Sequence, residues 1–253
     1  MSDPVENPFE VLSFTDADEV ARAAAVAFVD AVVAAQRDRV QAHVVLTGGG
    51  TGIAMLEHVR DHQGGIDWSA VNVYFGDERF LPPGDPDRNE VQARAALLDH
   101  VPIDPARIHS MPALGEDGCS TPEASAQRYA ELLAAHSPDG TVPDFDVHLL
   151  GMGGEGHVNS LFPETDAVRE SERFVVGVDD SPKPPPARVT LTLPAVRRSR
   201  QVWLLVTGAA KAEAVAAAVR GVAPEEIPAA GARGTERTVW FLDPEAAAQL
   251  PSM

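Results

Sequence analysis

Residues 43–61 read HVVLTGGGTGIAMLEHVRD, which is an apolar run, a glycine-rich turn and then a stretch with helical periodicity. We expect residues 43–46 to form a short strand and residues 53–61 to form a helix. Apolar residues are continuous in the first segment and recur every three or four positions in the second. A strand that passes through a tight turn into a helix is the first half of a β-α-β unit. The segment therefore predicts an α/β fold.

The rest of the chain repeats this alternation. The further predicted strands cover residues 71–75, 145–150, 174–178, 189–193, 202–206 and 239–242. The further predicted helices cover residues 20–37, 89–100, 122–135 and 209–220. Strands that alternate with helices imply right-handed crossovers and a parallel sheet. We expect a single domain over residues 1–253, with a doubly wound, mainly parallel, Rossmann-like sheet and helices on both faces.

Composition and charge narrow the class of function. Hydrophobic residues make up 44% of the chain and charged residues 23%, which is ordinary for a globular protein. A net charge of −18 leaves no basic face for nucleic acid. The apolar stretch 20–35 carries Arg22 and Asp30, so we expect no membrane span there, and the acidic N-terminus does not resemble a secretory signal. The single cysteine, Cys119, excludes an internal disulfide and favours the cytoplasm.

Ligands of doubly wound sheets bind beyond the carboxyl ends of the strands, so the residues that follow each predicted strand are site candidates. The glycine-rich turn after residues 43–46 would attract an anion through its backbone amides and the helix dipole. It is not a P-loop, and it fails the dinucleotide pattern because Ile53 stands where the third glycine belongs. A tight turn without a ligand is the alternative. The candidate anion-binding residues here are Gly48, Gly49, Gly50 and Thr51.

Charged side chains near other strand ends are the next candidates. Residues 77–79 follow a strand directly, where they would orient a polar substrate or simply face solvent. Lys211 begins the predicted helix 209–220, where a cation opposes the helix dipole, and a bound anion would compensate for this. A solvated lysine is the alternative. The charged candidates for binding a substrate are Asp77, Arg79, Lys183, Arg188 and Lys211.

A second glycine-rich turn, residues 151–157, matches the G-x-G-x-x-G spacing of dinucleotide sites, with Asp179 about twenty residues further on. A dinucleotide loop opens a long helix, however, and Pro163 prevents one from forming here. His157 is better interpreted as a general base with Glu155 beside it, because imidazole takes up a proton near neutral pH. A structural histidine is the alternative.

The remaining histidines are expected to be structural; they are His43, His58, His62, His100, His109, His136 and His148. The chain has no spacing typical of metal ligands and no Gly-x-Ser-x-Gly elbow. The residues alone therefore predict a metal-independent α/β protein that binds a phosphorylated small molecule near His157.

Four of these segments together resemble the 6-phosphogluconolactonases, which belong to the glucosamine/galactosamine-6-phosphate isomerase superfamily. The segments are TGGGT at 47–51, GDER at 76–79, GMGGEGHVNSLFP at 151–163 and TGAAK at 207–211. The related deaminases carry a glutamate before the proline, where this chain has Phe162, and tend to carry an aromatic residue at the position of Arg79. Two residues depart from the lactonase pattern, because Glu155 replaces the usual aspartate and Asn159 the usual alanine.

The resemblance implies hydrolysis of 6-phospho-D-glucono-1,5-lactone to 6-phospho-D-gluconate, in the oxidative pentose phosphate pathway and without a cofactor. It implies that His157 activates a water and that Glu155 orients the imidazole. The glycine turn, Lys211 and Arg188 would hold the phosphate, whereas Arg79 and Lys183 would contact the phosphate, the sugar hydroxyls or the product carboxylate. The expected partner is the small phosphorylated lactone alone, and the chain is expected to be a monomer or a weak homo-oligomer.

Three other functions stay open at this point. A sugar-phosphate deaminase or isomerase would need a replacement for the missing glutamate. A non-catalytic sugar-phosphate sensor would normally carry a DNA-binding module, for which this chain has no spare segment. An oxidoreductase that uses nicotinamide would need the glycine-rich turn at 151–157 to hold its cofactor.

Overall fold

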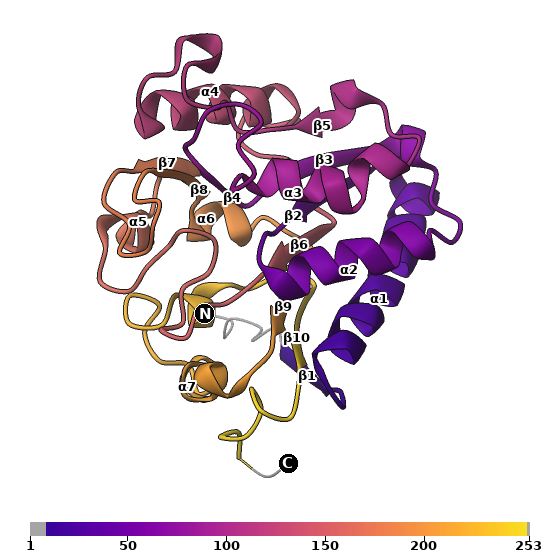
Figure 1. Ribbon diagram of the computed structural model, residues 1–253, viewed down its shortest axis with the longest axis vertical. Coiled ribbons are helices and arrows are strands. Elements are labelled where there is room, and N and C mark those ends of the chain that lie inside the picture. Colours follow the sequence, from indigo (N-terminus) through magenta and orange to yellow (C-terminus); the bar gives the residue numbers. More distant parts are fainter. Residues whose placement is uncertain (1–8, 252–253) are drawn as a thin grey trace, which may run out of the picture.

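The computed structural model describes residues 9–251 and contains a seven-stranded sheet in which every neighbouring pair of strands is parallel (Figure 1). From edge to edge the strands are β1 (Phe9–Ser13), β10 (Arg237–Leu242), β9 (Gln201–Val206), β6 (Val147–Leu150), β2 (Ala42–Leu46), β3 (Val71–Phe75) and β5 (Ile108–His109). The predicted parallel α/β sheet is therefore confirmed. Residues 1–8, where we expected no secretory signal, lie outside the described residues, as do residues 252–253.

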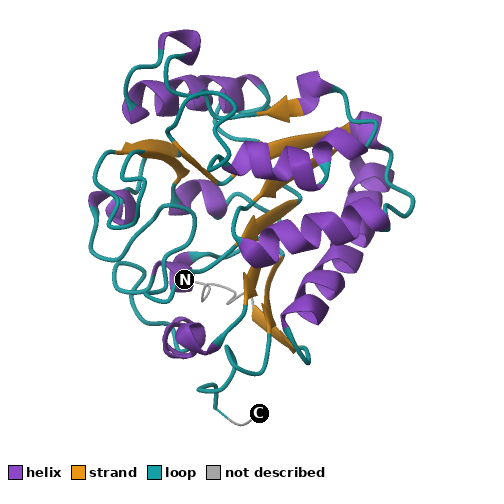
Figure 2. Cartoon of the chain, in the orientation of Figure 1, coloured by secondary structure: helices purple, strands orange, loops and turns teal. Residues whose placement is uncertain are grey.

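Helices cover both faces of this sheet, as predicted (Figure 2). One face carries α1 (Ala17–Arg39), α2 (Gly50–Asp61) and α3 (Asn89–Ala96). The other face carries α4 (Pro122–Ala135), α6 (Leu193–Val196) and α7 (Ala212–Val219), and α5 (Asp166–Arg169) lies in the connection that follows β6. None of the helices within residues 9–251 is long and apolar enough to cross a membrane.

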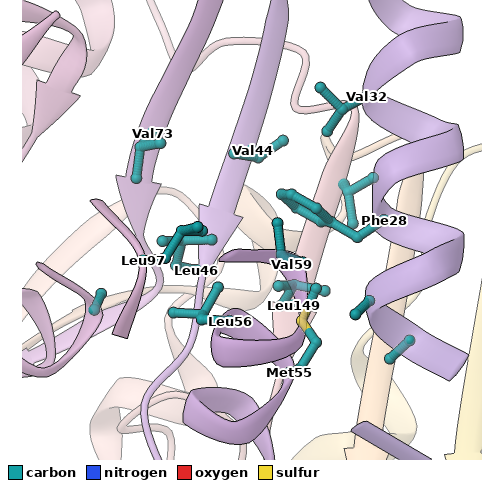
Figure 3. Packing of buried hydrophobic residues seen from close by; sticks show 14 of the residues in the cluster. Phe28, Val32, Val44, Leu46, Met55, Leu56, Val59, Val73, Leu97 and Leu149 are labelled. Carbon is teal, nitrogen blue, oxygen red and sulfur yellow. The ribbon is translucent and has the colours of Figure 1, made fainter. Parts of the chain in front are cut away.

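The core follows from the alternation of side chains along the strands. Val44 and Leu46 of β2 point to one face, where they pack among Phe28 of α1 and Met55 of α2 (Figure 3). Val45, between them, points to the other face and belongs to the cluster beneath α4. Because both faces are covered, the strand ends in the continuous apolar run Val44–Val45–Leu46 rather than alternating between apolar and polar residues.

Two helices begin earlier than the periodicity predicted. Helix α1 starts at Ala17 because the side chain of Asp16 accepts a hydrogen bond from the backbone N–H of Glu19 at 2.9 Å, an N-cap that extends the predicted helix 20–37. Helix α2 starts at Gly50, within the glycine turn, rather than at residue 53. The turn is therefore itself the N-terminus of a helix.

A separate antiparallel sheet, which the sequence did not predict, lies beside the main one. It consists of β4 (Asp77–Arg79), β8 (Arg188–Leu191) and β7 (Val175–Val178). The strands predicted at 174–178 and 189–193 exist, but they pair with each other and with β4 rather than with the parallel sheet. Of the two alternatives for residues 77–79, the solvated loop does not hold for Asp77 and Glu78, because both are buried in a strand that pairs with β8.

Strands β2 and β6 lie side by side at the point where the strand order reverses. From β2 the chain continues to β3 and β5 on one side, whereas from β6 it continues to β9 and β10 on the other. Loops that leave such a pair of strands diverge and leave a crevice between them. The loops after β2 and β6 are joined at its base by a hydrogen bond of 3.1 Å from the Gly151 N–H to Oγ1 of Thr47.

Candidate functional site

A cavity of about 400 Å³ opens above this crevice. The loops after β2, β3, β6 and β9 line it, together with the proline-rich loop before β8. Its lining residues are Thr47, Gly48, Gly49, Gly50, Thr51, Gly52, Asp77, Arg79, Asn89, Gly151, Met152, Gly153, His157, Asn159, Lys183, Arg188, Leu205, Thr207 and Lys211. Of the residues predicted from the sequence, only Glu155 is not part of the lining, and it stands directly behind His157.

The glycine turn presents a helix N-terminus to the cavity. Gly49 is the N-cap of α2 and has a φ of 83°, a conformation that glycine adopts without strain. It provides no side-chain cap, so the first amides of α2 remain available to a ligand, at the positive end of the helix dipole. Thr51 also reaches across the cavity, and its Oγ1 lies 3.0 Å from Oγ1 of Thr207.

His157 sits against a carboxylate and a lysine. Its Nδ1 lies 3.1 Å from Oε1 of Glu155, a contact that becomes an ion pair only when the ring is protonated. Nζ of Lys183 lies 2.8 Å from each carboxylate oxygen of Glu155. Burial lowers the pKa of His157, the charge of Glu155 opposes this, and the Lys183 cation reinforces it. The ring is therefore neutral near pH 7, with Nδ1 turned toward Glu155.

Position 153 requires glycine because the imidazole of His157 lies too close to leave room for a side chain. A Cβ added to Gly153 would stand 2.0 Å from Nδ1 of His157 and 2.6 Å from Oε2 of Glu155. The sequence could only assign this glycine to a dinucleotide pattern. Its position in the fold shows a different requirement, because the imidazole and the carboxylate pack on its bare Cα.

Phe162 forms the other wall of the imidazole. The two ring centroids are 4.4 Å apart with an interplanar angle of 31°, and the guanidinium of Arg188 lies 5.8 Å from the phenyl centroid. The phenyl ring is buried, and no proton-carrying group stands at this position.

Lys211 and Arg79 are two of the four cationic side chains of the described residues that line the cavity. Lys211 lies in a 3-10 turn directly before α7, and its Nζ donates a hydrogen bond of 2.7 Å to the carbonyl oxygen of Met152. Burial lowers the pKa of Lys211, and the nearby Lys183 cation adds to this effect. Arg79 leaves β4 and donates a hydrogen bond from its guanidinium to the carbonyl oxygen of Asp87.

Arg188 and Asp77 are buried in the wall between β4 and β8. Arg188 is 6% exposed and donates hydrogen bonds of 3.0–3.1 Å to three carbonyl oxygens of the proline-rich loop, those of Lys183, Pro184 and Pro185. Asp77 accepts a hydrogen bond of 2.6 Å from Ser160, and Nη1 of Arg188 lies 3.9 Å from the same carboxylate. Arg188 therefore supports the loop that carries Lys183.

Several polar residues at or below the cavity are not among the candidates named from the sequence, and three of them are Asn89, Thr207 and Glu78. Asn89 and Thr207 line it, and Nδ2 of Asn89 donates to Asp77. Glu78 is buried below, where it accepts hydrogen bonds from the backbone N–H groups of Arg79, Asn89 and Glu90, and burial raises its pKa to about 7. Thr207 had a signal, because it follows a predicted strand. Glu78 had none, since its burial depends on where α3 begins.

The dinucleotide alternative does not fit this geometry. The turn 151–157 leads into another turn and then Pro163, with no helix of useful length, and Asp179 is exposed at the end of β7. No histidine other than His157 lines the cavity within the described chain. Likewise, residues 9–251 contain no cluster of three or more His, Cys, Asp or Glu side chains that could hold a metal ion.

Comparison with known proteins agrees with this architecture. Residues 15–240 match the family described as glucosamine-6-phosphate isomerases/6-phosphogluconolactonase. The chain is 54% identical over 240 residues to a 6-phosphogluconolactonase of Mycobacterium tuberculosis, which covers 94% of this chain and 97% of the relative. It is 52% identical over 241 residues to a 6-phosphogluconolactonase of Streptomyces coelicolor, with 93% and 92% covered.

The fold is also that of a solved structure of 6-phosphogluconolactonase from Trypanosoma cruzi. The two superpose with a TM-score of 0.84 at 24% identity, over 99% of this chain and all of that one. The family match over nearly the whole chain thus accompanies three structural features. These are a strand order that reverses between β2 and β6, a glycine turn that opens α2, and a turn after β6 that carries His157. The chain therefore belongs to the glucosamine-6-phosphate isomerase/6-phosphogluconolactonase family.

Proposed function

We propose that this chain hydrolyses 6-phospho-D-glucono-1,5-lactone to 6-phospho-D-gluconate, a step of the oxidative pentose phosphate pathway. The supporting observation is that the neutral imidazole of His157 shares one cavity with the uncapped N-terminus of α2 and with Lys211. A base and an anion site in one cavity suit a phosphorylated substrate that reacts with water. The names of relatives that are more than half identical support the same reaction.

The substrate phosphate is assigned to the glycine-turn side of the cavity. The first amides of α2 and the Lys211 cation would bind the phosphate oxygens, and the helix dipole adds to the attraction. Arg188 adds positive charge to the wall, while Arg79, Asp77 and Lys183 remain for the sugar hydroxyls and the product carboxylate. Anchoring the phosphate fixes the distance from it to the reacting carbonyl.

The chemistry is assigned to His157. With Nδ1 held toward Glu155, Nε2 is the atom that takes a proton from water as the water attacks C1 of the lactone. The resulting tetrahedral intermediate collapses by expelling the ring oxygen, and His157 returns the proton to that oxygen. Glu155 stabilises the transient imidazolium, and a positioned base of this kind contributes about 10²–10⁴ in rate.

The environment of His157 favours this reaction over amino-sugar deamination. The position at which the deaminases carry glutamate holds Phe162, which packs on the imidazole and cannot transfer a proton. A deaminase on this scaffold would need another acid, and release of ammonia from glucosamine 6-phosphate would reveal one.

We also infer a single-domain enzyme over residues 1–253 that acts in the cytoplasm as a monomer or weak homo-oligomer and binds no nucleic acid. The lone Cys119 is buried in the core and suits a reducing compartment. The net charge of −18 opposes binding to a phosphate backbone.

The proposal is tested by comparing two substrates, the 6-phosphorylated lactone and glucono-1,5-lactone without phosphate, after EDTA treatment and with spontaneous opening subtracted. We expect hydrolysis of the phosphorylated lactone to be accelerated strongly and that of the other lactone weakly. Replacing Lys211 by Ala should raise KM for the phosphorylated lactone and leave the weak reaction nearly unchanged. Equal rates for both lactones would contradict the assignment of a phosphate site, and no acceleration of either would contradict the function.

A further inference from the structure

Asn159 lies on the cavity wall and has no role in the proposed hydrolysis by His157 and Glu155. Its side chain is 7% exposed, and it lines the cavity two residues after His157. Nδ2 of its amide has no hydrogen-bond partner within residues 9–251, whereas Oδ1 lies beside His148, whose pKa a hydrogen bond with Asn159 raises against burial. Native proteins pair the large majority of buried polar side-chain atoms. A polar group that enters the cavity is the partner that this amide lacks.

The local backbone does not account for the choice of asparagine. Asn159 has a φ of 51° in a turn closed by a hydrogen bond of 3.0 Å from the Leu161 N–H to the carbonyl oxygen of Val158. Asparagine is tolerated in such a conformation, commonly because its side chain bonds to nearby backbone groups. The amide of Asn159 makes no such bond. Glycine would satisfy the turn equally well, so the side chain needs another explanation.

The surroundings of the amide are neutral and closely fitted. A Cβ on Gly76 would stand 2.4 Å from Oδ1 of Asn159 and 3.2 Å from Nε2 of His148, so the amide and the imidazole both pack beside bare backbone. Burial lowers the pKa of His148 to about 3, which keeps that ring uncharged. Asp77, a carboxylate that also lines the cavity, already accepts hydrogen bonds from Ser160 and Asn89. The amide donor is thus left free for the ligand.

We propose that Nδ2 of Asn159 donates a hydrogen bond to the oxyanion that forms on the lactone carbonyl oxygen when water adds to C1. This inference rests on the proposed function, because His157 is what places the attacked carbonyl at this end of the cavity. A donor fixed in a buried wall stabilises charge as it develops and needs no reorganisation at that moment. Asn159 moves no proton, so proton transfer stays with His157.

The test replaces Asn159 by Gly, which keeps the positive φ and removes the whole side chain. The matched control is Glu164→Gly, at an exposed residue outside the cavity that also has a positive φ, of 60°. We expect kcat of Asn159→Gly to fall tenfold or more, KM to change less than threefold and the acidic limb of the pH profile to stay in place. Glu164→Gly should behave like the wild type in all three.

A second variant, Asn159→Asp, keeps the shape of the side chain and puts a carboxylate where the oxyanion would form. We expect it to be at least as slow as Asn159→Gly, with a thermal melting temperature close to that of the wild type. A kcat within tenfold of wild type in Asn159→Gly, or a loss confined to KM, would overturn the oxyanion role. A wild-type protein that does not accelerate lactone opening would refute the proposed function instead, so the two failures are distinguishable.

Discussion

Nζ of Lys183 lies 2.8 Å from both carboxylate oxygens of Glu155, so the residue that faces His157 is itself held by a cation from a different loop. Burial opposes ionisation of Glu155, but the hydrogen bond from Lys183 and the charges around it outweigh burial and hold the pKa near 2. Glu155 is therefore ionised throughout the working range. The pKa of His157 therefore depends on the opposing electrostatic effects of the Glu155 carboxylate and the Lys183 cation.

Replacing Lys183 by Met is expected to raise the pKa of His157, because the lysine cation lowers it. The base must be neutral to act, so the acidic limb of kcat/KM should move to higher pH. Lys183→Arg keeps the charge and serves as the control, with the limb near its wild-type position. A pH profile of kcat/KM measures both, and an unchanged limb in Lys183→Met would contradict the coupling.

Replacing Glu155 by Gln is expected to shift the same limb in the opposite direction. The carboxylate raises the pKa of His157 against burial, so its loss lowers that pKa and moves the limb to lower pH. The plateau rate should also fall by about tenfold or more, because the imidazolium loses its counterion. A shift of the acidic limb to higher pH would contradict the prediction that the charge of Glu155 raises the pKa of His157.

Gly153→Ala is expected to displace the imidazole, since the new Cβ would stand 2.0 Å from Nδ1. A misplacement of about 1 Å can lower kcat by about 10². Gly151→Ala is the matched control from the same loop, because the nearest atoms to its Cβ are 3.8 Å away. We expect Gly151→Ala to keep most of its activity. Single-turnover rates and thermal melts of both variants check this, and equal activity would show that the imidazole tolerates displacement.

The stability of the protein should fall on mild acidification because His148 is buried and neutral. Its pKa is lowered by burial to about 3, whereas an unfolded histidine titrates near 6.5. Between these values the unfolded state binds the proton and the native state does not, so stability is lost as pH falls through this window. At pH 5 the loss from this residue is roughly 2 kcal/mol.

Urea unfolding of the wild type and of His148→Gln at pH 7 and pH 5 measures this contribution. The variant is expected to be less stable at pH 7, because Ser199 loses the Nδ1 contact, but its stability should depend less steeply on pH. The same pH dependence in both proteins would show that other groups carry the acid sensitivity.

The sequence predicted what depends on local pattern. The strand at 71–75 was predicted with its final bounds, and the glycine turns were recognised as strand ends, because apolar runs and glycines are visible within a few residues. The small antiparallel sheet was not predicted, since Asp77 and Glu78 have the composition of a solvated loop. Pairing with β8, over a hundred residues away, and the start of α3 bury them.

The residues of the candidate site also divide into those that a local pattern predicts and those that depend on distant contacts. His157 and Glu155 are close in sequence and were predicted together. The lysine that holds Glu155 comes from a loop 28 residues further on, whose position depends on the carbonyl contacts of Arg188. Asn159 was visible only as a departure from the lactonase pattern. Its burial beside Gly76 and His148, which leaves Nδ2 without a partner in the described part of the chain, depends on contacts that are distant in sequence.

The central claim is that His157 is the base for lactone hydrolysis. It is tested most directly by adding EDTA-treated wild type or His157→Ala to freshly generated 6-phosphogluconolactone, coupled to excess 6-phosphogluconate dehydrogenase, with spontaneous opening subtracted. We expect the wild type to accelerate hydrolysis and the variant to be slower by about 10²–10⁴ at nearly unchanged KM. A variant as fast as the wild type would contradict the role of His157, and a wild type no faster than the blank would contradict the reaction itself.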